Sequence, residues 1–390
     1  MTLPAPQLWP DGASVDARGR LTIGGCDTVE LARVYGTPLY VLDAATFRAG
    51  CRAYRAALER HYPGASSAHY ASKALLNSAV VRLVAEERLG LDVVSGGELY
   101  VALRAGFPAD RIHLHGNAKP RAELEQALAA SIGKIVVDTL DELDLLARLT
   151  DGRPQPQAIM LRLSPDIVAD THAHIQTGSA ASKFGLPLDA LDAAAVRIAR
   201  APGLRLAGLH SHLGSQILDY TPIAQAVGIL LDCAARLRDE HGLVVAEISP
   251  GGGLGIPYTA DQSTPDIDAY VATVAQAMQA GCAARSFPPL RLVVEPGRSI
   301  VARAGVALYE IVATKPLPGV GGWDLGIEEQ IQLPTPNSQL PTRYLHVDGG
   351  MADNIRPALY GARYSALLAN RAAEPAAEHV HIAGRYCESG

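Results

Sequence analysis

The strongest constraint on the fold is a regular alternation of short apolar runs with alanine-rich stretches over about 260 residues. The apolar runs are strand-like and lie at 65–71, 89–93, 112–115, 135–137, 158–163, 204–210, 244–248 and 290–294. Helical stretches between them include 46–60, 78–88, 97–105, 121–130, 139–149 and 223–240. Eight strand–helix units at this length favour an α/β fold with a closed (β/α)8 TIM-like barrel over an open doubly wound sheet.

A chain of 390 residues is too long for one ordinary core and indicates two domains. We assign the barrel to 43–305. Short strand-like segments at 13–25, 306–314 and 344–348 predict a β-rich domain built from both chain ends, 1–42 and 306–390. The segment 316–341 is rich in Pro, Gly and Gln and is predicted to be an exposed loop.

Composition excludes several classes of protein. A net charge of -6 gives no electrostatic footprint for nucleic acid. No apolar run approaches the roughly 20 residues that cross a bilayer, and the N-terminus lacks the pattern of a signal peptide. The five cysteines are single, without CxxC spacing: Cys26, Cys51, Cys233, Cys282 and Cys387. We therefore expect a cytoplasmic protein without disulfides, metal site, membrane or nucleic-acid partner.

Lys73 follows the first predicted barrel strand, at the end where such barrels place their chemistry. Burial at a strand end lowers the pKa of a lysine, because it disfavours the ammonium. A neutral amine can condense with a carbonyl, as in enzymes whose lysine holds pyridoxal phosphate as a Schiff base. The alternative is a surface lysine that opens the next helix. Asp92 and Arg162 are further polar residues at predicted strand ends.

The glycine run Gly251–Gly253 follows the seventh predicted strand. Glycines let successive backbone N–H groups converge on a phosphate without obstruction by side chains, although a flexible loop would have the same composition. His212 ends the sixth strand and could stack on a cofactor ring, with Ser215 near the phosphate. Metal binding by His210 and His212 is less favoured, since no third ligand with metal-like spacing is evident.

Glu295, Gly297 and Arg298 follow the eighth predicted strand. A carboxylate beside a pyridine nitrogen keeps that nitrogen protonated and makes the ring a strong electron sink, which favours decarboxylation. The alternative is a structural ion pair between Glu295 and Arg298.

Together these motifs resemble the fold-type III pyridoxal-phosphate decarboxylases, and most closely the diaminopimelate decarboxylase family. The resemblance runs from about residue 30 to residue 390. Its motifs are Tyr-Ala-Ser-Lys-Ala at 70–74, Leu-Asp-Val-Val-Ser-Gly-Gly-Glu-Leu at 91–99, His-Gly-Asn-Ala-Lys at 115–119, Ser-Lys-Phe-Gly at 182–185, 210–216, 251–253, 295–299, Val-Asp-Gly-Gly-Met at 347–351, Arg-Pro-Ala-Leu-Tyr at 356–360 and Cys-Glu-Ser-Gly at 387–390.

The resemblance implies the decarboxylation of meso-2,6-diaminopimelate to L-lysine and carbon dioxide in a homodimer with shared active sites. It implies Lys73 as the Schiff-base lysine, Glu295 at the ring nitrogen, and Cys387 as the proton donor that reaches the partner subunit. The remaining residues implied for the cofactor are Arg162 near the ring hydroxyl, His212 on the ring, and Ser215, Gly253, Gly297 and Arg298 at the phosphate. Those implied for the distal end of the substrate are Arg298, Arg356, Tyr360 and Glu388.

The distal end of diaminopimelate carries a carboxylate and an ammonium, which suit a bidentate arginine and Glu388, respectively. Arg356 and Tyr360 have an alternative as an i, i+4 pair on one helix face. Related decarboxylases of D-ornithine, D-lysine or a carrier-bound glutamyl group, and a non-catalytic homologue, stay open as rivals. Members of the resembled family continue beyond Cys-Glu-Ser-Gly. We therefore expect a β domain without closing strands that still binds the cofactor but decarboxylates poorly.

Overall fold

The computed structural model describes residues 3–167, 183–317, 342–376 and 378–387. The chain divides into two compact units. One contains both chain ends and comprises 1–46, 257–263 and 303–390. The other comprises 47–256 and 264–302.

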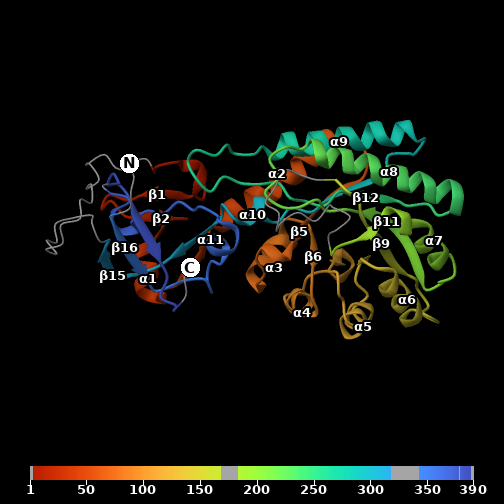
Figure 1. Cartoon of the computed structure of the whole chain (residues 1–390), viewed down its shortest axis with the longest axis horizontal. Helices are drawn as coiled ribbons and strands as arrows, with labels where there is room; N and C mark the ends of the chain where they lie inside the picture. Colours follow the sequence, from red (N-terminus) through yellow and green to blue (C-terminus); the bar gives the residue numbers. More distant parts are fainter. Residues whose placement is uncertain (1–2, 168–182, 318–341, 377, 388–390) are drawn as a thin grey trace, which may run out of the picture. The chain divides into compact units, whose positions relative to one another are not determined.

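The second unit is a closed barrel of eight parallel strands (Figure 1), which confirms the predicted fold class. Around the barrel these strands are β5 (Ser66–Ala71), β6 (Gly90–Val93), β7 (Ile112–Leu114), β8 (Lys134–Val137), β9 (Gln157–Ser164), β11 (Leu204–His210), β12 (Glu247–Ser249) and β13 (Arg291–Val294). The ring closes where β13 pairs with β5, with Val294 opposite Ala68. A two-residue strand, β10 (Leu186–Pro187), extends β9.

Helices lie around the outside of the strands (Figure 1). They are α2 (Ala44–His61), α3 (Ser78–Glu86), α4 (Gly96–Arg104), α5 (Arg121–Ala129), α6 (Leu140–Leu149), α7 (Leu191–Ala199), α8 (Thr221–His241), α9 (Ile267–Ala284) and the short α10 (Arg298–Val301). Side chains cap several of them: Asn77, Ser95 and Thr139 accept N–H groups in the first turns of α3, α4 and α6. The helices α4 and α6 thus begin shortly after β6 and β8, whereas the turn Ser72–Ala74 lies between β5 and α3.

Most predicted strands agree with the structure to within one or two residues, and the seventh deviates most. It was expected at 244–248, but Val244 is 66% exposed and β12 begins at Glu247. The apolar run therefore starts outside the barrel. Glu247, which lay within the predicted run, is the first residue of the observed strand and is buried.

The described residues of the first unit form three small sheets. The strands β1 (Ala13–Val15), β2 (Leu21–Ile23) and β3 (Cys26–Asp27) are antiparallel, β4 (Leu39–Leu42) pairs with β14 (Gly305–Leu308), and β15 (Ile311–Pro316), β16 (Arg343–Val347) and β17 (Val380–Ala383) form the third sheet. Two helices complete the unit, α1 (Thr28–Tyr35) and α11 (Arg356–Tyr360). The β-rich domain built from both chain ends is thus confirmed. The segment predicted as one strand at 306–314 is split instead, because its halves pair with β4 and with β16.

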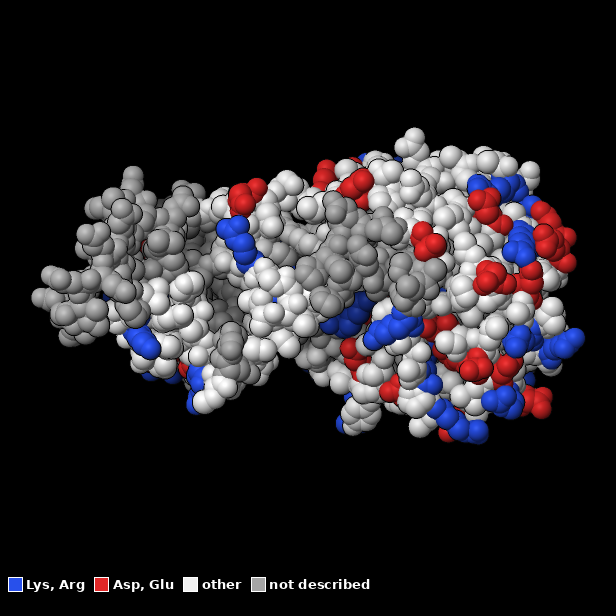
Figure 2. All heavy atoms as spheres, viewed as in Figure 1, with Lys and Arg blue, Asp and Glu red and all other residues white. Residues whose placement is uncertain are grey.

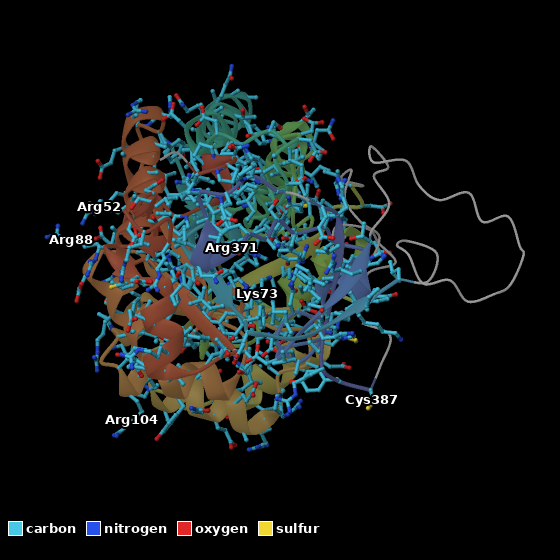
Figure 3. All side chains as sticks on the ribbon, turned by 90° about the vertical axis from the view of Figure 1, so that its left-hand side faces the viewer. Arg52, Lys73, Arg88, Arg104, Arg371 and Cys387 are labelled. Atoms are coloured by element: carbon cyan, nitrogen blue, oxygen red, sulfur yellow. The ribbon has the colours of Figure 1, made fainter. Side chains whose placement is uncertain are left out.

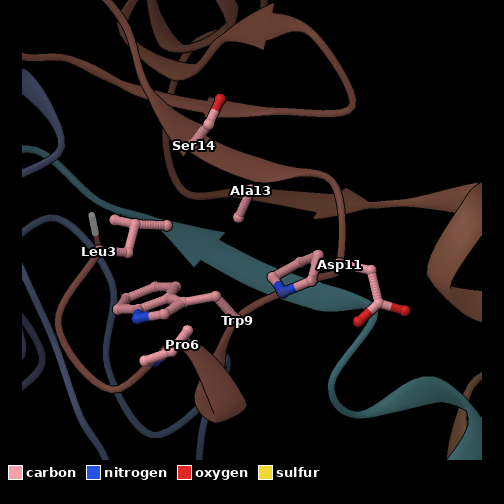
Figure 4. Close-up of a pocket in the computed structure, with 7 residues that line it drawn as sticks. Leu3, Pro6, Trp9, Asp11, Ala13 and Ser14 are labelled. Atoms are coloured by element: carbon pink, nitrogen blue, oxygen red, sulfur yellow. The ribbon is translucent and has the colours of Figure 1, made fainter. Parts of the chain in front are cut away.

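A small apolar core holds the first unit together. Leu3, Leu21, Ile23 and Ala372 are buried there, and Trp9 packs against them. Trp9 also lines a pocket of about 380 Å³ with Leu3 and Asp11 (Figure 4). The indole N–H of Trp9 donates to the carbonyl of Pro4 at 2.9 Å, which fixes the ring in the pocket wall.

The barrel unit carries charges of both signs on its surface (Figure 2). Several form ion pairs, such as Arg285 with Asp232 at 2.7 Å and Arg197 with Asp144 at 3.1 Å. Within the described ranges, we find no helix with the length and apolar character needed to cross a bilayer. The predicted loop at 316–341 lies outside the described residues from 318 onward.

Candidate active site

Lys73 lies in a short 3-10 turn, Ser72–Ala74, directly after β5. In Figure 3 it lies inward of Arg52, Arg88 and Arg104, which point outward. Solvent reaches the side chain, yet protein groups surround it closely. Burial, followed by the neighbouring guanidinium of Arg162, lowers the pKa of Lys73. The direction of the pKa agrees with the expectation from the sequence, whereas the exposure of Lys73 is closer to the alternative of a surface lysine, so its Schiff-base role stays a prediction.

Glu295 follows β13 and is 7% exposed. Its Oε1 accepts a hydrogen bond from Ser249 Oγ at 2.6 Å, and its Oε2 lies 2.9 Å from His210 Nε2. Burial alone would raise the pKa of Glu295, but His210 and His115 lower it to about 2. Glu295 is therefore a buried carboxylate that stays ionised at neutral pH. Its contacts with His210 and Ser249 differ from the alternative of a pair with Arg298.

The turn at Gly251–Gly253 requires glycine for steric reasons. A Cβ at Gly252 would lie 2.0 Å from the carbonyl oxygen of Glu295, and one at Gly253 would lie 2.5 Å from that of Gly214. Gly251 and Gly253 also have φ values of +79° and +106°. The N–H of Gly251 donates to Ser249 Oγ and that of Gly252 to a histidine nitrogen. The phosphate assignment therefore rests on Gly253, which stays a prediction.

His212 lies beside this turn, where its Nδ1 accepts the N–H of Gly252 at 3.3 Å. Burial and the charge of Lys73 hold the pKa of His212 well below its usual value, so the imidazole is neutral. A neutral flat ring fixed by a backbone hydrogen bond suits stacking on a cofactor ring. The stacking role itself stays a prediction.

Two arginines lie at the same end of the barrel. Arg298 Nε donates to Ser215 Oγ at 3.1 Å, which brings together two residues predicted at the phosphate. Gly297 precedes Arg298 and lies close to β5, since a Cβ there would lie 3.1 Å from that of Ala71. Arg162 is 8% exposed, and its Nε lies 3.8 Å from Asp138 Oδ1. Cationic groups thus gather where an anionic cofactor is expected.

Of the residues predicted to hold the distal end of the substrate, Arg356 and Tyr360 belong to the first unit and Arg298 to the second. The guanidinium of Arg356 lies over two aromatic rings, 5.2 Å from the centroid of Tyr360 and 5.5 Å from that of Tyr258. The contact with Tyr360 is the i, i+4 pair within α11 that we considered as an alternative. Cys387 is exposed, and Glu388 lies outside the described residues.

Sequence analysis did not predict the polar interior of the barrel. Asp92 lies among three histidines, with Oδ1 at 3.3 Å from His69 Nδ1, 3.7 Å from His113 Nδ1 and 3.5 Å from His115 Nε2. Spacing along the chain could not reveal this cluster, because its members come from three different strands. Two buried groups have metal-ligand atoms close together, His69–Asp92–His113 and His115–His210–Glu295. In the second group, His210 lies close to His115 and Glu295, two possible metal ligands that the spacing along the sequence did not indicate.

These residues fit pyridoxal phosphate. The cofactor needs an amine of lowered pKa, an acid that stays ionised, and a close approach of backbone to phosphate. Lys73 and Glu295 meet the first two needs at one end of the barrel, and Gly253 is the residue of the glycine turn predicted to meet the third.

Comparison with known proteins gives the same result. The family model described as "Pyridoxal-dependent decarboxylase, pyridoxal binding domain" matches residues 44–302. The diaminopimelate decarboxylase of Bacillus methanolicus is 42% identical over 378 residues, which is 96% of this chain and 82% of that protein. The enzyme of the same name from Bacillus subtilis (strain 168) is 41% identical, over 95% of this chain and 80% of the relative.

Solved structures agree with the sequence matches. Diaminopimelate decarboxylase from M. jannaschii in complex with L-lysine has a TM-score of 0.82 at 29% identity, covering 97% of this chain and 82% of that one. The Helicobacter pylori enzyme, also complexed with L-lysine, has a TM-score of 0.78 at 28% identity, covering 93% and 82%. By sequence, fold and the arrangement at the barrel rim, this chain belongs to the diaminopimelate decarboxylase family of pyridoxal-dependent decarboxylases.

Proposed function

We propose that this protein decarboxylates meso-2,6-diaminopimelate to L-lysine and carbon dioxide with pyridoxal phosphate. The observation that supports this most strongly is that two groups lie at the same end of the barrel. One is Lys73, an accessible amine of lowered pKa, and the other is Glu295, a buried ionised acid. An amine alone would suit many cofactor enzymes. The buried acid meets a need of decarboxylation, because its charge keeps the ring nitrogen protonated and the ring a strong electron sink.

Pyridoxal phosphate, when bound, supplies an electron sink for the carbon that loses carbon dioxide. Lys73 would hold the cofactor covalently, and Glu295 would hold a proton on the ring nitrogen through its charge. His212 would cover the ring, and Arg162 would lie near the ring hydroxyl. The phosphate would be held by Ser215, Gly253, Gly297 and Arg298.

The substrate's distal carboxylate would bind Arg356, Tyr360 and Arg298, and its ammonium would bind Glu388. The two aromatic rings around Arg356 support this role, because they hold the guanidinium in place by its faces and leave its edge N–H groups for a carboxylate. Substrates without a distal carboxylate would leave that arginine without its anionic partner.

The thiol of Cys387 would donate the proton that replaces the lost carboxylate. Its exposure supports a role in a second subunit's site, so we propose a homodimer with shared active sites. All five cysteines are free, which supports a reducing, cytoplasmic location.

Borohydride reduction tests the assignment of Lys73 directly. Reduction of the cofactor-loaded protein, followed by peptide mapping, should find pyridoxyl-lysine at Lys73. The variant Lys73→Arg should lose the label and the visible absorption band, whereas Lys119→Arg should keep the band. A label on another lysine, with Lys73 unmodified, would refute the assignment.

A further inference from the structure

The interior of the barrel beneath Glu295 is filled with ionisable side chains. Barrel interiors are usually packed with branched apolar residues, so ionisable side chains in this position indicate a role beyond packing. Six of these side chains come from six strands, and His115 directly follows one of them, β7; they are His69, Asp92, His113, His115, Lys134, His210 and Glu247. Except for Lys134, each of these residues is at least nine-tenths buried.

Two glycines make room for this cluster. Gly90 lies opposite His69 in the pairing of β5 with β6, and a Cβ there would lie 2.3 Å from the His69 ring. Gly208 lies opposite Glu247 in the pairing of β11 with β12, and a Cβ there would lie 2.5 Å from Glu247 Cγ. The backbone of the neighbouring strands thus accommodates these polar side chains.

Lys134 fixes the proton position of His113. Its ammonium lies 3.1 Å from Glu247 Oε1 and 3.1 Å from His113 Nε2. An ammonium only donates, so Nε2 of His113 accepts. Burial and the charges of His69 and Lys134 hold the pKa of His113 well below its usual value, so the ring is neutral and its one proton is on Nδ1.

Nδ1 of His113 faces Oδ1 of Asp92 at 3.7 Å, and His69 stacks on the same ring at 4.0 Å between centroids. The gap exceeds a hydrogen bond, so the N–H acts on the carboxylate electrostatically. The ligand atoms of His69, Asp92 and His113 lie close together.

The cluster continues from Asp92 to Glu295 through one imidazole. His115 Nε2 lies 3.5 Å from Asp92 Oδ1 and 4.0 Å from Glu295 Oε1. Among the described residues, both oxygens of Asp92 and Nε2 of His115 are buried without a hydrogen-bond partner. Their energies therefore depend on the polar and charged groups around them, which include His69 and His113 beside Asp92 and the carboxylate of Glu295 beside His115.

We propose that Lys134 and His113 are positioning residues, which orient Asp92 and His115 so that Glu295 keeps its charge toward the cofactor. Asp92 repels Glu295, and His115 attracts both carboxylates. The Nδ1–H of His113 offsets part of the negative charge of Asp92, and this lessens both the repulsion of Glu295 by Asp92 and the pull of Asp92 on His115. The proposal rests on the proposed role of Glu295 at the ring nitrogen.

The test uses cofactor-loaded His113→Leu, Glu295→Gln and the double variant, with His241→Leu as the matched control. His241 pairs with Asp192 at 3.0 Å at the end of α8, outside the barrel interior. We expect His113→Leu to lower kcat about fivefold, with KM changed less than twofold, and to shift the absorption spectrum of the bound cofactor in the direction seen for Glu295→Gln. The control should keep the native spectrum and rate.

The double variant separates the proposal from the function on which it rests. We expect His113→Leu to cost nothing further in the Glu295→Gln background, because the charge it supports is gone. A native rate and spectrum for Glu295→Gln would refute the proposed role of Glu295. A strong Glu295→Gln effect with a native His113→Leu enzyme, or with losses that multiply fully in the double variant, would overturn the positioning role alone.

The variant His113→Asn covers the case in which His113→Leu does not fold. Its amide N–H can take the place of Nδ1–H toward Asp92. We expect its spectrum and kcat to stay near native. A loss in His113→Asn as large as in Glu295→Gln, with unchanged thermal stability, would overturn the proposal.

Discussion

Replacing Glu295 by glutamine removes one buried negative charge and keeps the shape of the side chain. The carboxylate is held by Ser249 at 2.6 Å and His210 at 2.9 Å, and its pKa is about 2 against an ordinary 4.5. At 1.36 kcal/mol for each pKa unit, the folded site favours the ionised form by about 3 kcal/mol. Glu295 is therefore ionised throughout the neutral range, and the neutral amide takes away a full charge.

The loss of that charge lowers the proton affinity of the ring nitrogen. A decrease of only one pKa unit there is about 1.4 kcal/mol, so we expect kcat to fall at least about tenfold. Cofactor affinity should change less, because the residues proposed at the phosphate remain. Steady-state carbon dioxide release and titration of the apoprotein with cofactor measure the two quantities separately.

Glu87→Gln is a suitable control for Glu295→Gln. Glu87 is also a buried, paired carboxylate, with Arg52 at 2.7 Å and Arg48 at 3.0 Å, but it lies on the outer helices. We expect this variant to lose stability and keep its kcat. A native kcat in Glu295→Gln would refute the electronic role of this residue.

Three further outcomes follow from the site. Gly252→Ala should lower cofactor affinity at least about tenfold, because its Cβ would lie 2.0 Å from the carbonyl oxygen of Glu295; fluorescence titration measures the affinity. Gly228→Ala is the control, since a Cβ at Gly228 would meet no other atom. Arg356→Met should raise KM for meso-diaminopimelate at least about tenfold with a smaller change in kcat, since a charge-assisted hydrogen bond is worth about 1.5–3 kcal/mol. The control Arg371→Met, in the same unit, should leave KM unchanged. Because the pKa of Glu295 is lowered on folding, its contribution to stability is present above about pH 4.5 and is lost as pH falls toward 2. Between pH 7 and pH 3 the wild type should lose about 2 kcal/mol more unfolding free energy than Glu295→Gln, measured by urea titration; equal losses would contradict the lowered pKa.

The sequence was sufficient to predict the barrel because strand periodicity and helix signals repeat eight times. It also placed Lys73 and Glu295 at the rim, since both follow apolar runs directly. The boundary at β12 was wrong because Val244 is apolar but exposed. The run at 306–314 was misjudged as one strand, since strand partners are set by tertiary pairing and not by local composition.

The polar interior could not be predicted from one sequence. His69, Asp92 and His113 lie on separate strands, and their contact depends on the register between β5, β6 and β7. Each histidine alone resembles an ordinary strand residue. Gly90 gave a weak signal, because a glycine within a strand marks a close approach by another group. The predicted domain boundaries at 43 and 305 and the roles assigned to Cys387 and Glu388 stay predictions.

The most direct test of the proposed function is to supply the cofactor-loaded protein with meso-diaminopimelate and to measure carbon dioxide and L-lysine together. We predict equal amounts of both products, no release from L-ornithine or L-lysine at the same concentration, and no release by Lys73→Ala. Carbon dioxide released from L-ornithine or L-lysine but not from meso-diaminopimelate would contradict the proposed substrate. Release by Lys73→Ala at the native rate would contradict the proposed site.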